Sequence, residues 1–236
     1  MPAVNLVSSL DDGPGADAPV LILGNPIGTT SQVWERQLPV LARHFRVLRL
    51  EWRGHGVPGA QSDAPPGPYT IAELGADVLT AANHYGVTSF AYTGVSLGGM
   101  AGLWLAANAP ERVASLAVCC AALEPLPSAR SWRERAALVR ADGMAAIAGL
   151  MPPRWFTPSF IQRSPGDVAA VVTMLRGTSP DGYAGCADAI AELDLRPLLG
   201  AVKAPTLVLS GEQDPAAPPY QGAITARGIA GARLTV

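Results

Sequence analysis

A serine between two glycines, at residues 94–98 (Gly-Val-Ser-Leu-Gly), is the stretch of the chain that points most directly to chemistry. Residues 89–93 before it are apolar, β-branched or aromatic, as in a buried strand, and residues 97–109 carry apolar side chains at helical spacing. We therefore predict that Ser96 lies at a sharp strand-to-helix turn, where the backbone is strained and the glycines avoid collisions. Such a turn exposes the hydroxyl, so Ser96 is a candidate nucleophile; a helix-capping serine is the alternative.

Two backbone N–H groups are expected to face that hydroxyl. Leu97 follows Ser96 at the start of the predicted helix, where an N–H has no helical partner and favours negative charge. Residues 24–28 (Gly-Asn-Pro-Ile-Gly) follow a short apolar stretch, and Pro26 stiffens the turn that they form. We expect the N–H groups of Ile27 and Leu97 to form an oxyanion hole, which acts through main-chain donors. An ordinary strand-to-helix turn is the alternative for residues 24–28.

Asp214 is the candidate acid. It follows a predicted strand at residues 206–209, and catalytic groups gather at the carboxyl ends of the strands in an open parallel sheet. The alternative is an aspartate that only forms the turn before Pro215. Because the two roles are compatible, we keep Asp214 as the catalytic acid.

The composition of the chain excludes several classes of protein. The 236 residues are 49% apolar and 15% charged, which indicates a compact globule, and the net charge of −2 gives no footprint for nucleic acid or an anionic membrane. The three cysteines have no metal-ligand spacing, and the adjacent pair at residues 119 and 120 suggests buried thiols in a reducing cytosol. No signal peptide and no apolar run of about 18 residues is present, so we expect a cytoplasmic protein.

Strand-like and helix-like segments alternate along most of the chain, which favours an α/β fold with a mostly parallel sheet and helices on both faces. Thr70 and Glu73 form a capping-box pattern that predicts the start of a helix. Another helix is predicted from Ser31 through Leu41, with its end near His44. Further strands are predicted at residues 46–52, 113–121 and 232–236.

Residues 123–193 interrupt this alternation. They contain helical stretches separated by prolines and no convincing strand, which predicts a helical insertion that caps the core. We therefore expect one core domain formed by residues 1–122 and 194–236, with the helical cap at residues 123–193 between its two parts.

The order of these parts resembles the α/β-hydrolase superfamily: an oxyanion turn, Arg-Gly-His-Gly, the serine turn, a helical cap and a late Gly-Glu-x-Asp. Longer stretches are similar to the 3-oxoadipate enol-lactonases within that superfamily. They comprise residues 24–30, 44–50, 66–70, 94–100, 154–158, 182–186 and 194–197.

The resemblance implies a triad of Ser96, Asp214 and a histidine in a loop after the last strand. It also implies that His55, in the Arg-Gly-His-Gly motif, is a packed structural residue and not the base. Glu51 stands where the family usually has aspartate, a departure that does not touch the chemistry. No histidine follows His84 in this sequence, so the expected base is missing.

Two interpretations of the missing base follow. In the first, the chain is a truncated form of an active lactonase, because the sequence stops inside the last predicted strand and lacks the helix that would cover it. In the second, the chain is a non-catalytic ligand-binding or scaffold protein with this fold.

The resemblance implies a serine hydrolase that opens 3-oxoadipate enol-lactone in the β-ketoadipate pathway of aromatic catabolism, with no metal or organic cofactor. A small, dicarboxylate-like lactone calls for a cation in the pocket, and oligomeric state stays open. The cap residues that we expect to bind it are Arg154, Trp155, Arg133 and Trp132, with Arg135 as a further candidate. Alternatives are a carboxylesterase, a carbon–carbon bond hydrolase or a cofactor-free haloperoxidase-like hydrolase; dehalogenases and epoxide hydrolases are disfavoured because they use aspartate where Ser96 stands.

Overall fold

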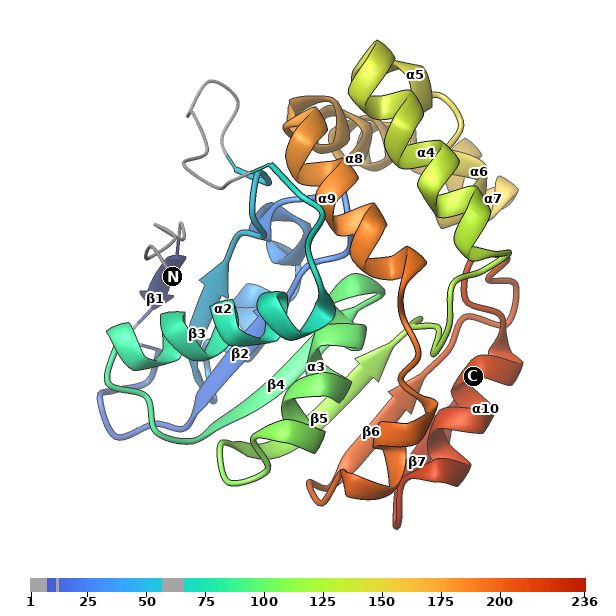
Figure 1. The fold of residues 1–236 in the computed structure, drawn as a ribbon. Helices are drawn as coiled ribbons and strands as arrows, with labels where there is room; N and C mark the ends of the chain where they lie inside the picture. The colour runs from blue at the N-terminus through green and yellow to red at the C-terminus, as the bar shows by residue number, and fades with distance from the viewer. Residues whose placement is uncertain (1–7, 12, 57–65) are drawn as a thin grey trace.

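A computed structural model describes residues 8–11, 13–56 and 66–236. Within them, seven strands form one sheet in the order β1-β3-β2-β4-β5-β6-β7 (Figure 1). Only β1 runs antiparallel, against β3, and every other pairing is parallel. The strands are β1 (Ser8–Asp11), β2 (Val20–Gly24), β3 (Arg46–Leu50), β4 (Phe90–Val95), β5 (Val113–Cys119), β6 (Thr206–Leu209) and β7 (Arg233–Thr235). The predicted α/β class and mostly parallel sheet are thus confirmed.

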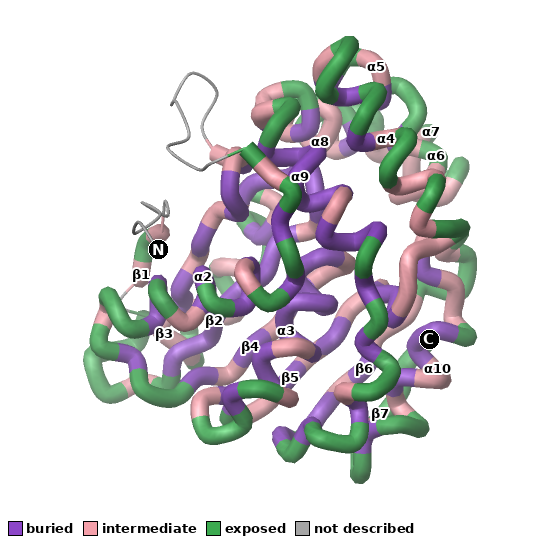
Figure 2. The backbone as a smooth tube through the Cα atoms, in the orientation of Figure 1, coloured by how far each residue is buried: buried purple, intermediate pink, exposed green. Residues whose placement is uncertain are grey.

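Alternate side chains of the central strands pack on opposite faces of the sheet. Ile22 and Leu48 join the larger apolar cluster, which includes α2 (Ile71–His84) and α3 (Leu97–Asn108). Leu21 and Val47, one residue earlier in each strand, join a smaller cluster with Trp34 on the other face. All five residues of the central strand β2 are accordingly buried, whereas the three residues of the edge strand β7 are exposed (Figure 2). Helices therefore cover both faces, as the alternating pattern predicts.

The predicted start of α2 is confirmed, because the Thr70 hydroxyl accepts from the Glu73 N–H at 3.1 Å and the Glu73 carboxylate accepts from the Thr70 N–H at 2.8 Å. The continuous helix predicted from Ser31 to near His44 is wrong. The structure has a short 3-10 helix, η1 (Ser31–Trp34), and one turn of helix, α1 (Leu38–Leu41). Pro39 supplies no N–H for a helical bond to the preceding turn, so the helix cannot run through.

Residues 123–193 form helices and no strand within the described part of the chain. We call α4–α9 the helical cap; the domain boundaries given above stay a prediction. Its helices are α4 (Ala129–Asp142), α5 (Ala145–Ala148), α6 (Pro152–Trp155), α7 (Pro158–Arg163), α8 (Pro165–Gly177) and α9 (Pro180–Ala191). The cap lies over the carboxyl ends of the parallel strands (Figure 1), and the chain then returns through η2 (Arg196–Ala201), β6 and α10 (Pro219–Gly228) to β7.

The cap docks onto the core through close backbone contacts. A Cβ added at Gly182 in α9 would lie 2.5 Å from the Gly54 Cα, so both glycines permit this approach. The Ser179 N–H donates to the Gly54 carbonyl at 2.9 Å, and the Tyr69 N–H donates to the Gly185 carbonyl at 3.2 Å. Among the residues that the structure describes, no helix has both the length and the apolar composition needed to cross a bilayer.

Candidate active site

Ser96 occupies the turn between β4 and α3 with a left-handed backbone, φ 53° and ψ −115°. A positive φ is strained for a non-glycine residue and persists only where the surrounding structure holds it. Here the Ser96 N–H donates to the Cys119 carbonyl of β5, and the Ser96 carbonyl accepts from the Met100 N–H, both at 2.9 Å. The strand-to-helix turn predicted from the sequence is therefore present, and it is held from both sides.

Glycines bring the serine turn and the residue 24–28 turn into direct contact. A Cβ added at Gly94 would lie 2.3 Å from the Gly98 carbonyl carbon, and one added at Gly98 would lie 2.1 Å from the Gly24 carbonyl oxygen. Neither distance is compatible with a side chain. The missing side chains thus allow the start of α3 and the end of β2 to approach closely, which places the two predicted oxyanion donors on adjoining turns.

The residue 24–28 turn is anchored by Asn25, which is fully buried. Its side-chain oxygen accepts from Trp34 Nε1 at 2.9 Å, and its side-chain nitrogen donates to the Leu50 carbonyl at 2.9 Å and to Glu51 Oε2 at 3.1 Å. Its backbone carbonyl accepts from Trp52 Nε1 at 2.7 Å. Both side-chain polar groups and the backbone carbonyl of Asn25 therefore hold the turn, a role that the sequence patterns did not indicate.

Glu51 supports the same turn from the other side. Both of its carboxylate oxygens accept from the Ser31 N–H at 2.9 Å, so the carboxylate links the end of β3 to the start of η1. Burial raises the pKa of Glu51, an effect that the hydrogen bonds from Ser31 partly offset. This residue is structural here, as expected.

Ile27 and Leu97, the two predicted oxyanion donors, lie on the two adjoining turns described above. Ile27 and Leu97 both have buried side chains, at 4% and 0% exposure, so their contribution is through the main chain. Leu97 is the first residue of α3, and its N–H therefore has no acceptor within the helix. Within the described residues, neither N–H donates a backbone hydrogen bond outside a regular element. The arrangement can stabilise negative charge that develops beside Ser96.

Asp214 lies at the same edge of the sheet as Ser96. Ser96 follows β4 and Asp214 follows β6, with β5 between them, so two strand spacings, about 10 Å, separate these strands. Asp214 Oδ1 accepts from the N–H groups of Ala216 and Ala217 at 2.8 and 2.9 Å. The aspartate thus forms a turn, and these bonds also fix its carboxylate at the carboxyl end of the sheet.

Cys120 comes directly after β5, between the strands that carry Ser96 and Asp214, and has a positive φ of 46°. Its N–H donates to the Leu209 carbonyl at 2.8 Å. Burial raises the pKa of the Cys120 thiol to about 11, and the nearby Asp214 carboxylate adds to the shift. The thiol therefore stays protonated near neutral pH.

None of the three histidines is placed as the partner of Asp214. His44 and His84 precede β3 and β4, so they lie at the amino edge of the parallel sheet, opposite Ser96. His55 follows β3 but is only 1% exposed, and its Nδ1 lies 3.0 Å from the Arg53 carbonyl. Burial lowers the pKa of His55 to about 4, so the ring is neutral. His55 is a packed residue, as the resemblance implies.

The cap residues expected at the substrate divide into two groups. Arg154 lines a cavity in the helical cap together with Arg135. Trp155 is the last residue of α6, which ends at Phe156. Arg133 pairs with Glu192 on the outer side of the cap and is absent from the cavity lining. Trp132 stacks against Arg135 and donates from Nε1 to the Leu126 carbonyl at 2.9 Å. Of the three candidate arginines, Arg135 and Arg154 therefore line one cavity and Arg133 does not.

The sequence of this chain matches the model of a known protein family. Residues 19–164 match the family model for the alpha/beta hydrolase fold, and they make up more than half of the chain. The chain belongs to this family. It is 40% identical over 200 residues to 3-oxoadipate enol-lactonase 2 of Acinetobacter baylyi, an alignment that covers 85% of this chain and 73% of that relative.

Solved structures of hydrolases have the same fold. The crystal structure of the enol-lactonase from Burkholderia xenovorans LB400 has a TM-score of 0.93 and 39% identity, and the match covers 99% of this chain and 89% of that one. A thermophilic esterase from Thermogutta terrifontis, determined with malate bound, has a TM-score of 0.87 and 28% identity over 97% of this chain and 83% of its own. Similarity to hydrolases therefore extends over the core and the cap.

Proposed function

We propose that this chain carries the nucleophile, the acid and the oxyanion hole of a serine hydrolase that opens a small enol-lactone, of the 3-oxoadipate enol-lactone type. The observation that supports this most is the strained backbone of Ser96, held against the turn that contains Ile27. The enol-lactone substrate class is supported by the two relatives of that name at about 40% identity.

In this proposal Ser96 Oγ attacks the lactone carbonyl, and the N–H groups of Ile27 and Leu97 bind the oxyanion that forms. The ring C–O bond then breaks, which leaves an acyl-enzyme and an enolate that takes up a proton and becomes a ketone. Water hydrolyses the acyl-enzyme and releases the open-chain acid. Each proton transfer needs a base or acid beside Ser96, and Asp214 would hold a histidine in that position.

The base is the part of the mechanism that these 236 residues do not supply, since none of the three histidines lies beside Ser96. Loss of the triad base lowers turnover by about 10⁶-fold where triad members act together. We therefore expect very slow lactone opening by the chain as it stands. We also expect imidazole from solution to reach the space between Ser96 and Asp214 and to act as the base.

The test is covalent labelling of Ser96 by a fluorophosphonate, followed by intact mass and peptide mapping. We predict one adduct, on Ser96, that forms slowly and forms faster as imidazole is added. Ser96→Ala should give no adduct, and Asp214→Asn should reduce the acceleration by imidazole, because the neutral amide no longer stabilises an imidazolium.

Other results would overturn parts of the proposal. An adduct on another residue, or none with imidazole present, would favour the alternative of a non-catalytic ligand-binding protein. Labelling of Ser96 together with opening of neutral esters, but not of the enol-lactone, would leave a general carboxylesterase. Rapid lactone turnover without imidazole would show that a different residue of this chain acts as the base.

A further inference from the structure

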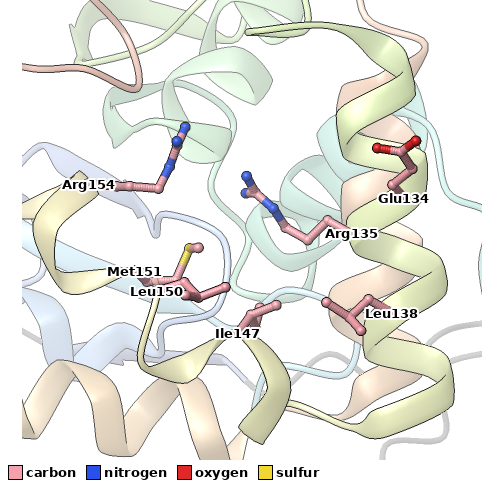
Figure 3. A pocket seen from close by; sticks show the side chains of 7 residues that line it. All are labelled: Glu134, Arg135, Leu138, Ile147, Leu150, Met151 and Arg154. Atoms are coloured by element: carbon pink, nitrogen blue, oxygen red, sulfur yellow. The ribbon is translucent and has the colours of Figure 1, made fainter.

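The cap contains a cavity of about 480 Å³ between α4, α5 and α6. Its apolar walls and its charged residues come from different positions on these helices. Figure 3 shows the guanidinium groups of Arg135 and Arg154 facing the same space, whereas Glu134 projects from another side of α4. The apolar lining consists of Leu138, Ile147, Leu150 and Met151.

The two arginines of this cavity differ from most others in the cap. Arg133, Arg140 and Arg130 pair with Glu192, Asp188 and Glu134, respectively. Within the described residues, neither Arg135 nor Arg154 forms an ion pair. Glu134 also lines the cavity, but its carboxylate pairs with Arg130, so the two cavity arginines have no carboxylate partner of their own among the described residues.

Arg135 is held in place without a carboxylate. Its guanidinium carbon lies 4.3 Å from the centre of the Trp132 ring, a cation–π contact. Stacking occupies the face of the guanidinium and leaves its in-plane N–H groups available to bind an anion. The geometry therefore positions the cation but does not neutralise it.

Tyr183 is not among the residues that line the cavity, but it places a third, buried donor near the two arginines. The residue is 0% exposed, yet its hydroxyl forms no hydrogen bond within the described chain, which is unusual for a buried phenol. Burial raises the pKa of Tyr183, while the nearby guanidinium groups of Arg135 and Arg154 oppose the shift. The phenol therefore remains protonated, beside the two unpaired cations, with an O–H to donate.

The ring of Tyr183 also contacts the catalytic edge. A Cβ added at Gly28, in the turn that contains Ile27, would lie 3.1 Å from Tyr183 Cε2. Tyr183 thus packs on the oxyanion turn with one edge of its ring, and the two cap arginines lie near its hydroxyl. One side chain joins the two regions.

We propose that Arg135, Arg154 and the Tyr183 hydroxyl form a carboxylate-binding site for small acids with an apolar body, and that this site selects substrates for the reaction at Ser96. A carboxylate can accept from two guanidinium groups and a phenol at once, which satisfies every group left unpaired here. The apolar walls suit a methylene chain attached to it. The selection of substrates rests on the proposed function, whereas the binding of a carboxylate does not.

Binding of adipate, measured by isothermal titration calorimetry, tests the site without any need for turnover. We expect adipate to bind and the neutral adipamide, of the same length, not to bind. Arg135→Gln, Arg154→Gln and Tyr183→Phe should each weaken adipate binding by about tenfold or more, as expected for loss of a hydrogen bond to a charged group. Arg133→Gln is the matched control, because it removes the same charge from the same helix outside the cavity, and it should bind adipate as the unaltered chain does.

Tyr183→Phe separates ligand binding from a structural role. It removes one oxygen that has no partner, so the denaturation midpoint should stay the same or rise while adipate binding falls. Equal binding of adipate and adipamide, equal weakening by Arg133→Gln, or no binding of adipate at millimolar concentration would each overturn the inference. Ser96→Ala should keep adipate binding, so a failure of the labelling experiment with selective adipate binding would refute only the proposed function.

Discussion

The candidate active site depends on the strained backbone of a single residue, Ser96. A positive φ at a non-glycine residue costs about 1–3 kcal/mol. Its contacts offset this cost, because the Ser96 N–H and carbonyl are both hydrogen-bonded and Gly98 meets the Gly24 carbonyl. The strained backbone of Ser96 therefore depends on the close contact between β2 and α3, which only a residue without a side chain at position 98 permits.

Gly98→Ala tests this arrangement. The added Cβ would lie 2.1 Å from the Gly24 carbonyl oxygen, which is backbone and cannot turn aside, so we expect destabilisation by about 1–3 kcal/mol or more. Gly149→Ala is the control, because nothing lies within 4 Å of its added Cβ and its φ is −77°. Urea denaturation of both variants is the measurement. Equal stability of the two would show that β2 and α3 are not in close contact.

The sequence could place Ser96, Ile27, Leu97 and Asp214 at one edge of the sheet, because these residues follow apolar strands and parallel strands end at the same edge. Their catalytic roles stay predictions. The sequence could not predict Tyr183. A tyrosine on the apolar face of a helix is usually a core residue, and only the folded structure reveals that its hydroxyl lacks a partner. The choice between Arg133 and Arg135 also depended on structure, because neighbouring helical positions point in different directions.

At the scale of elements, the turn after β3 connects the core to the cap. The Arg53 side chain donates to both oxygens of Asp77 in α2, at 2.5 and 2.8 Å, in a buried pair. Gly54 contacts Gly182 in α9, and the next residue, His55, is buried. Disturbance of this turn should therefore affect both α2 and the docking of the cap.

Acidification provides a test through His55. Burial lowers its pKa from 6.5 to about 4, so the unfolded chain binds more protons than the folded chain between these values. Stability that is present above pH 6.5 should therefore fall as the pH decreases toward 4, by about 3 kcal/mol from this residue. The measurement is the free energy of unfolding against pH.

His55→Asn should flatten this pH dependence relative to the unaltered chain. His84→Asn, which replaces an exposed histidine, should retain the slope because His55 is still present. An unchanged slope in the His55 variant would mean that its ring is accessible to protons in the folded state.

Helices and strands could be predicted from the sequence where the signal lies within a few neighbouring residues. The capping box at Thr70 and Glu73 predicted the start of α2 correctly. The helix predicted over residues 31–44 was wrong, because the apolar spacing was given more weight than Pro39. Strand β1 was not predicted, because its four residues carry no clear alternation and it is defined by pairing with β3.

For the whole molecule, one edge of the sheet gathers the features that matter. The residues that follow β2, β4 and β6 supply Ile27, Ser96 and Asp214, and the cap covers the same edge. This convergence follows from parallel strands, whose carboxyl ends must lie together. The fold could therefore be inferred from the order of the motifs. The cavity could not, because its shape depends on how the cap helices pack against one another.

A crystal structure of this chain with a small alkylboronic acid, which adds to an activated serine as a tetrahedral adduct, tests whether Ser96 and the two backbone N–H groups form one catalytic site. We predict a bond from boron to Ser96 Oγ and one boronate oxygen at about 2.7–3.1 Å from the backbone nitrogens of both Ile27 and Leu97. Boron bound to another residue, or an adduct on Ser96 whose oxygens reach neither nitrogen, would show that Ser96 is not the nucleophile or that Ile27 and Leu97 do not form the oxyanion hole.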